Sequence, residues 1–123
     1  MVTGFQDVYV NVANMATAVA FYRDVLGLVV TDEDPYFTGL SAGEVRIGLH
    51  WTGGAAVPSV PHDAHGPHTG ATITFRVADL AAARQKLEAT AAKILGSSNN
   101  PWGKILVLAD PDGNILKLMQ PPG

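Results

Sequence analysis

The chain has 123 residues, enough for one domain that buries roughly two thirds of the surface of its unfolded chain. Hydrophobic residues make up 47% of the sequence and charged residues 15%, which excludes a disordered chain. The absence of cysteine excludes disulfides and thiolate ligands, and a net charge of −3 with scattered basic residues argues against a nucleic-acid partner.

The first half of the chain is predicted to form a strand, a helix and three further strands. Apolar and polar residues alternate over residues 8–12, as on a half-buried strand. A helix should follow, with Asn14 as its N-cap, Gly27 as its C-cap and one apolar face formed by Met15, Val19, Tyr22 and Leu26. The remaining strands are predicted at residues 28–31, 36–40 and 44–51.

The second half repeats this order. Residues 75–83 resemble residues 10–18, and Asp79 takes the place of Asn14 as a predicted N-cap. A strand at 72–77 should precede a helix with Leu80, Ala83 and Leu87 on one face. Strands are then predicted at 92–95, 102–109 and 114–119, the last two joined by a tight Asp-Pro-Asp-Gly turn.

This repetition predicts an α+β fold made of two βαβββ modules within a single domain, 1–123. The modules span residues 1–52 and 70–123, and residues 53–69, rich in Gly, Pro and His, form a linker. Each four-stranded sheet should carry one helix on its outer face. Because the opposite faces must also be covered, we expect the two sheets to curve around a shared cleft.

Two motifs point to a known family. They are Phe-Tyr-Arg-Asp-Val-Leu-Gly at residues 21–27 and Asp-Pro-Asp-Gly-Asn at residues 110–114. With the duplicated module, they resemble the vicinal oxygen chelate superfamily, which includes glyoxalases, extradiol dioxygenases, fosfomycin-resistance enzymes and bleomycin-binding proteins. The resemblance covers residues 5–120 and implies the glyoxalase/bleomycin-resistance fold, and often a homodimer.

The family chemistry normally depends on one divalent metal, held by His, Glu or Gln from the first and fourth strands of each module. Strand parity assigns these positions to Asp7, Gly48, Thr72 and Lys117. Glycine offers no ligand atom, threonine is a poor ligand, and a lysine ammonium repels a cation. The sequence therefore predicts no metal, no other cofactor and no catalytic residue. An ion pair between Asp7 and Lys117 is expected to replace the metal.

Candidate ligand-binding residues are those that parity or position places at the cleft: Asp7, Tyr9, Phe37, His50, Trp51, Thr72, Trp102 and Lys117. Trp102, within an Asn-Pro-Trp-Gly stretch similar to that of bleomycin-resistance-like members, is expected to stack on a flat ring. The acidic residues Asp32, Glu33 and Asp34 either favour a cationic ligand or are simply solvated.

The preferred function is a metal-free protein of the antibiotic-resistance type that sequesters an aromatic or planar compound. One alternative is a glyoxalase-like or dioxygenase-like metalloenzyme with non-standard ligands, drawn from His50 and the linker histidines His62, His65 and His68. Another is a metal-free enzyme with His50, Asp7 or Lys117 as acid or base. The linker histidines otherwise belong to a solvated loop.

The sequence also predicts where the protein acts and with what. No run approaches the ~18 apolar residues of a membrane-spanning helix, so no membrane partner is expected. Residues 1–7 lack the basic and apolar regions of a secretory signal. We therefore expect a cytoplasmic homodimer whose partner is a small molecule.

Overall fold

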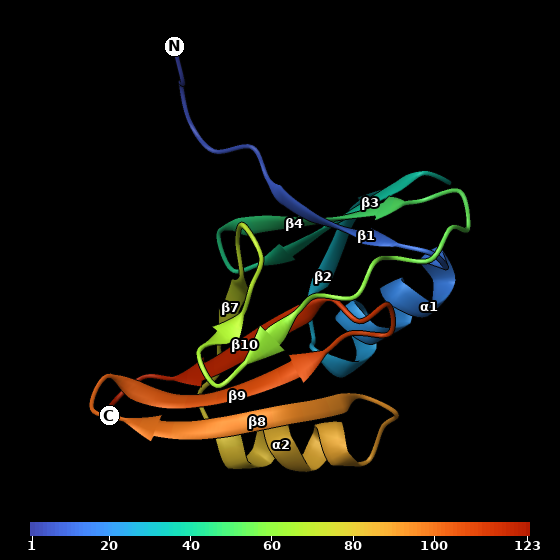
Figure 1. Ribbon diagram of the computed structural model, residues 1–123. Helices are drawn as coiled ribbons and strands as arrows, with labels where there is room; N and C mark the ends of the chain where they lie inside the picture. The colour runs from blue at the N-terminus through green and yellow to red at the C-terminus, as the bar shows by residue number, and fades with distance from the viewer. The chain divides into compact units, whose positions relative to one another are not determined.

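The computed structural model describes residues 1–123 (Figure 1). The chain divides into two compact units, Met1–Val57 and Pro58–Gly123, and each contains one four-stranded sheet and one α-helix. The predicted α+β class and βαβββ order are confirmed in both halves. None of the helices has the length and apolar character needed to cross a membrane.

The first unit contains a sheet with strand order β1-β4-β3-β2. β1 runs parallel to β4, and the other neighbours are antiparallel. In chain order its elements are β1 (Val8–Val12), α1 (Met15–Ala20), a π-helix η1 (Phe21–Val25), β2 (Val29–Glu33), β3 (Phe37–Ala42) and β4 (Val45–Trp51).

The core of the first unit lies between the helical segment and one face of this sheet. Alternate residues of β4 are fully buried on that face, with Ile47 at 1% and Leu49 at 0% exposure. They pair in register with Val8 and Val10 of β1, so the predicted parity of both strands is confirmed. The remaining buried hydrophobic residues come from all parts of the unit: Val12, Ala18, Val19, Phe21, Tyr22, Leu28 and Leu40.

The first helix departs from the predicted regular spacing. α1 ends at Ala20, and the next five residues form the π-helix, in which the N–H of Leu26 donates to the carbonyl of Phe21 at 3.0 Å. The consecutive rings of Phe21 and Tyr22 are both buried and meet edge-on, 5.4 Å apart. A wider turn accommodates this pair. Gly27 follows with a φ of 80°, as its predicted C-cap position requires.

The second unit has the sheet order β7-β10-β9-β8, again with a parallel pair, β7 and β10. A small hairpin precedes this sheet. The elements are β5 (His62–Asp63), β6 (Gly66–Pro67), β7 (Ile73–Arg76), α2 (Leu80–Glu88), β8 (Lys93–Asn100), β9 (Gly103–Ala109) and β10 (Ile115–Gln120). Alternate strand residues under α2 form the core, among them Leu106, Leu108, Leu116 and Leu118.

The predicted caps and turn are confirmed. The side chain of Asn14 accepts the N–H of Thr17, and that of Asp79 accepts the N–H of Ala82, both at 3.0 Å. In the turn between β9 and β10, Gly113 has a φ of 85° and its N–H donates to the carbonyl of Asp110. The duplicated motif therefore builds the same local structure twice.

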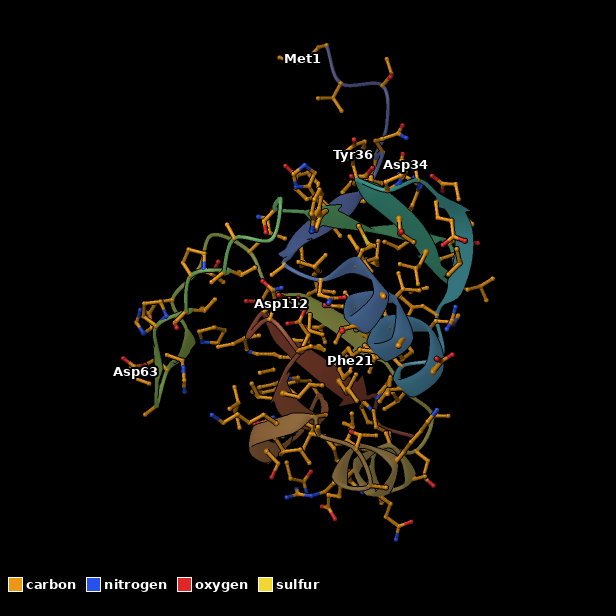
Figure 2. All side chains as sticks on the ribbon, turned by 90° about the vertical axis from the view of Figure 1, so that its right-hand side faces the viewer. Met1, Phe21, Asp34, Tyr36, Asp63 and Asp112 are labelled. Atoms are coloured by element: carbon orange, nitrogen blue, oxygen red, sulfur yellow. The ribbon has the colours of Figure 1, made fainter.

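Two elements of the second unit differ from the prediction. β8 extends to Asn100 instead of ending at Leu95, because its polar second half pairs with β9 after a bulge between Ile94 and Gly96. The segment expected to be a loop contains the β5–β6 hairpin, where Asp63 accepts the N–H of His65 and forms an ion pair with His68 at 2.9 Å. Figure 2 shows Asp63 on this hairpin.

Candidate functional site

The face of the first sheet opposite α1 carries most of the predicted site residues of the first unit. We call it the helix-free face. Its central positions follow from strand register, since Tyr9 pairs with Gly48 and Asn11 pairs with His50, while β3 contributes Phe37 and Gly39. The structure thus brings Tyr9, Phe37 and His50, from three adjacent strands, onto one surface.

These three rings form a contiguous cluster. Tyr9 and Phe37 meet edge-on with ring centroids 6.1 Å apart, and Tyr9 lies 5.6 Å from the His50 ring at a tilt of 45°. Nδ1 of His50 lies 3.2 Å from Oδ1 of Asn11, which fixes the orientation of the imidazole. Tyr9 is nevertheless 54% exposed, so the cluster presents aromatic surface rather than filling a core.

A missing side chain makes room for this cluster. A Cβ at Gly48 would overlap the Phe37 ring at Cζ and would lie 2.9 Å from the Cβ of Tyr9. No residue larger than glycine therefore fits between these two aromatic residues without displacing one of them. Gly48 was predicted to be a lost metal-ligand position, and its space is taken by the Phe37 ring.

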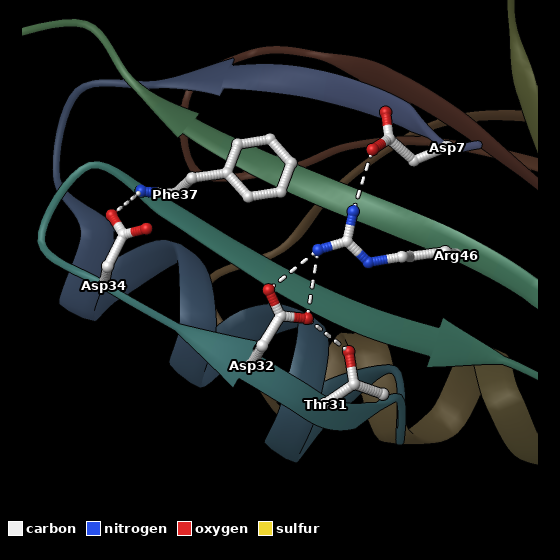
Figure 3. A network of polar contacts seen from close by, with 6 residues as sticks. All are labelled: Asp7, Thr31, Asp32, Asp34, Phe37 and Arg46. Atoms are coloured by element: carbon white, nitrogen blue, oxygen red, sulfur yellow. Dashed lines mark hydrogen bonds and ion pairs between the residues drawn. The ribbon is translucent and has the colours of Figure 1, made fainter.

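Beside the rings, the Arg46 side chain lies between two carboxylates (Figure 3). Its Nη1 donates to Oδ2 of Asp7 at 2.8 Å, and its Nη2 donates to Oδ2 and Oδ1 of Asp32 at 2.8 and 3.0 Å. The Cζ of Arg46 also lies 5.3 Å from the centroid of the Phe37 ring, within the range of a cation–π contact.

These contacts shift the pKa values of Asp32 and Arg46. Hydrogen bonds from Arg46 and then from the Thr31 hydroxyl hold the pKa of Asp32 below its ordinary value. The hydrogen bond to Asp32 in turn raises the pKa of Arg46. The guanidinium therefore keeps its positive charge at neutral pH. It donates hydrogen bonds but does not act as a general acid.

Asp7 was predicted as a site residue, but its partner Arg46 was not. Asp32, considered only as a contact for a cationic ligand, binds Arg46 instead. A signal for Arg46 was present, because parity placed it on the same face as Asp7 and the parallel pairing of β1 with β4 puts their ends side by side. Asp32 lies on β2 beyond a register shift at Val30, and alternation along β2 could not have located it. An ion pair between Asp7 and Lys117 stays a prediction, and it would compete with Arg46 for the Asp7 carboxylate.

The other predicted site residues belong to the opposite face of the first sheet or to the second unit. Trp51 pairs in register with Val12, and this parity puts it on the opposite face from His50, where its indole N–H donates to the carbonyl of Ala13 at 3.1 Å. Lys117 lies on β10 of the second unit, paired with Thr74, and Thr72 precedes β7. Trp102 lies in the β8–β9 turn and is 64% exposed.

The donor chemistry of the four family metal positions does not fit a divalent cation. In the first unit Asp7 is bound to a guanidinium, and Gly48 has neither a ligand atom nor space for one. In the second unit the positions are a hydroxyl and an ammonium, Thr72 and Lys117. Neither unit gathers three or more His, Asp or Glu side chains that could hold a metal ion.

The hairpin histidines make structural contacts. His68 donates its backbone N–H to the carbonyl of Pro61 and pairs through Nε2 with Asp63. This hydrogen bond, followed by that from the His65 backbone, lowers the pKa of Asp63. The hairpin and β8 also border a hollow of about 200 Å³, whose lining includes Val107 and Ile115.

A larger hollow, of about 700 Å³, lies between the first turns of α2 and the β8–β9 hairpin. Leu106 forms part of its lining, together with polar residues such as Ser97, Asn99 and Lys104. None of the sequence-predicted site residues lines it.

Comparison with known proteins gives the family and the fold. The family model of the Glyoxalase/Bleomycin resistance protein/Dioxygenase superfamily matches residues 4–118. No curated protein matches the chain.

Several solved structures share its fold. TnmS3, an antibiotic binding protein from Streptomyces sp. CB03234, is 19% identical with a TM-score of 0.71, and the match covers 99% of this chain and 100% of that one. A lactoylglutathione lyase from Agrobacterium tumefaciens is 18% identical with a TM-score of 0.70, covering 96% and 93%. The fosfomycin resistance protein FosX from Listeria monocytogenes is 12% identical with a TM-score of 0.76, covering 99% and 96%.

Proposed function

The chain belongs to the Glyoxalase/Bleomycin resistance protein/Dioxygenase superfamily, and we propose that it binds and sequesters an aromatic or planar small molecule without transforming it. The observation that carries this proposal is the exposed cluster of Tyr9, Phe37 and His50 on the helix-free face of the first sheet. The Phe37 ring packs against Gly48, and the His50 ring is held by its contact with Asn11 on the same face.

Such a cluster suits a flat ligand. Ring-on-ring contacts contribute about 0.5–1.5 kcal/mol each beyond the apolar area that they bury. Three rings from three strands offer several such contacts at once, and the polar edges of Tyr9 and His50 can orient the ligand through hydrogen bonds. The cluster therefore provides both affinity and orientation for an aromatic compound.

The chemistry of the neighbouring groups supports binding rather than turnover. His50 contacts an amide, and an amide cannot accept or relay a proton as a carboxylate does. Oδ2 of Asp7 already accepts a hydrogen bond from Arg46, so this carboxylate oxygen is engaged within the network instead of facing a substrate. The family metal positions lack suitable donors, so these residues do not favour a metalloenzyme. The contacts of His50 and Asp7 do not favour a metal-free enzyme either.

The fold alone does not decide among functions, since a lyase and an antibiotic binding protein share it. The likeness to TnmS3 makes an antibiotic a reasonable first ligand to test. Thr72, Trp102 and Lys117 are proposed as further ligand contacts, and a cytoplasmic homodimer as the working state. Trp51, on the opposite face of the first sheet from His50, is not among these contacts. Light scattering of the purified protein tests the dimer.

The test is a screen of planar aromatic compounds, antibiotics included, by thermal shift, with hits confirmed by calorimetry. Tyr9→Ala should weaken binding about tenfold, equivalent to about 1.4 kcal/mol. Tyr36→Ala is the matched control, because Tyr36 is also well exposed (65%, against 54% for Tyr9) but lies before β3 and contacts Trp51 instead of the cluster. Equal affinities of the two variants would refute the assigned site.

Turnover is checked on the same hits. Mass spectrometry after prolonged incubation should recover the compound unchanged, and a chelator should leave the affinity as it was. Formation of product, or loss of binding with the chelator, would overturn the proposal in favour of an enzyme.

A further inference from the structure

We propose that Arg46 is a positioning residue that holds the Phe37 ring in its ligand-facing orientation, and that the glycine pair Gly39 and Gly48 forms the slot in which both groups lie. The effect on ligand affinity rests on the function proposed above. The effect on the Phe37 ring does not, and it can be measured without any ligand.

The slot follows from strand register. Gly39 on β3 and Gly48 on β4 are direct cross-strand partners, so two neighbouring positions of the helix-free face have no side chain. A Cβ at Gly39 would lie 2.5 Å from Oδ1 of Asp32 and 2.6 Å from Nη2 of Arg46, and a Cβ at Gly48 would overlap the Phe37 ring. The guanidinium and the ring thus occupy the volume that two side chains would take.

The guanidinium is anchored on both sides. Asp7 immediately precedes β1 and Asp32 lies on β2, and these are the two edge strands of the sheet order β1-β4-β3-β2. Arg46 extends from β4 over the slot and binds a carboxylate at each end (Figure 3). With its ends fixed, the guanidinium cannot leave its place 5.3 Å from the Phe37 ring without breaking at least one ion pair.

The ring has few other restraints on that side. Phe37 is the first residue of β3 and is only partly buried, with Tyr9 meeting it edge-on from one direction. Removal of Arg46 would leave it free to change rotamer. Ordering a mobile side chain upon binding costs about 0.5–1.5 kcal/mol, which corresponds to a roughly twofold to twelvefold loss of affinity.

The first experiment observes the ring in the ligand-free protein. Fluorophenylalanine is incorporated at the four phenylalanines, and the Phe37 signal is assigned with Phe37→Leu. Arg46→Gln and Gly39→Ala should each shift and broaden that ¹⁹F signal. Arg84→Gln, which removes a single exposed ion pair to Glu88, and Gly96→Ala, whose added Cβ meets nothing within 4 Å, are the matched controls and should not.

The outcomes separate the two proposals. An unchanged Phe37 signal in Arg46→Gln would overturn the positioning role, whatever the ligand data show. If Gly39→Ala fails to fold, Arg46→Gln alone decides.

The second experiment measures affinity for a compound that the wild type binds. Arg46→Gln should bind it twofold to twelvefold more weakly, with Arg46→Lys restoring part of the loss. A moved ring with unchanged affinity would refute the role in binding. If the wild type binds no compound, the proposed function fails while the ring signal still tests Arg46.

Discussion

The ring of Phe37 on β3 lies over the backbone of Gly48 on β4, in the volume that a side chain at position 48 would occupy. Glycine normally weakens the middle of a strand, and its presence there marks a place where another group approaches the backbone closely. In this sheet the approaching group is an aromatic ring of the proposed binding surface.

Gly48→Ala is therefore expected to destabilise the protein. The added methyl group must displace the Phe37 ring or the backbone of β4, and overpacking of this kind costs about 1–3 kcal/mol of unfolding free energy. Urea denaturation measures the loss. Gly96→Ala, in strand β8 with open space around its Cβ, should lose far less, and equal losses would contradict the close-packing argument.

The two N-cap side chains should contribute similar amounts to the free energy of unfolding. Asn14→Ala and Asp79→Ala each remove one side-chain acceptor from a helix N-terminus, at a cost of about 1 kcal/mol. Denaturation curves of both variants test this. Asn99→Ala, an exposed asparagine on β8, is the control, and a comparable loss there would refute a specific capping contribution.

Asp110 is expected to be the most sensitive residue of the β9–β10 turn. It is 5% exposed and accepts the backbone N–H groups of Asp112 and Asn114 together with the Asn114 side-chain amide. Asp110→Ala leaves these donors without their acceptor and should cost about 2–3 kcal/mol. Asp110→Asn keeps one acceptor oxygen, so thermal denaturation should show a smaller loss for it. The reverse order would contradict this account.

Acid stability should depend on Asp32. Because its pKa is lowered in the folded state, its contribution is present above the ordinary carboxyl pKa of about 3.9 and is lost as the pH falls through the lowered value. Asp32→Asn should therefore weaken the fall in Tm below about pH 4. Glu44→Gln is the control, because Glu44 is exposed in the β3–β4 turn and forms no ion pair. Its Tm should fall with decreasing pH as that of the wild type does.

The sequence was sufficient to predict the fold because the signals involved are local. Alternation along β1 and β4 identified the buried faces, Asn14 and Asp79 identified the helix starts, and Asp-Pro-Asp-Gly identified the last turn. The second half of β8 could not be predicted as a strand because its residues are polar. Its strand conformation is imposed by pairing with β9 and not by its own composition.

The candidate site could be predicted only in part. Parity grouped Tyr9 with His50 correctly on one face, since both lie on strands whose alternation is clear. The Arg46–Asp32 ion pair depends on a bulge in β2, and the place of Phe37 over Gly48 depends on side-chain packing. Neither feature changes the alternation of apolar and polar residues, so neither can be predicted from a single sequence.

The π-helix Phe21–Val25 bears on how the length of this chain could change. In a regular helix, one added or removed residue rotates everything beyond it by about 100° and turns the apolar stripe away from its partner. The wide turn that ends at Leu26 already holds one residue more than an α-turn would. Shortening the chain by one residue at this turn should therefore convert it to ordinary helix and leave Gly27 and β2 in place, whereas the same deletion within α2 should misalign Leu80 with Leu87.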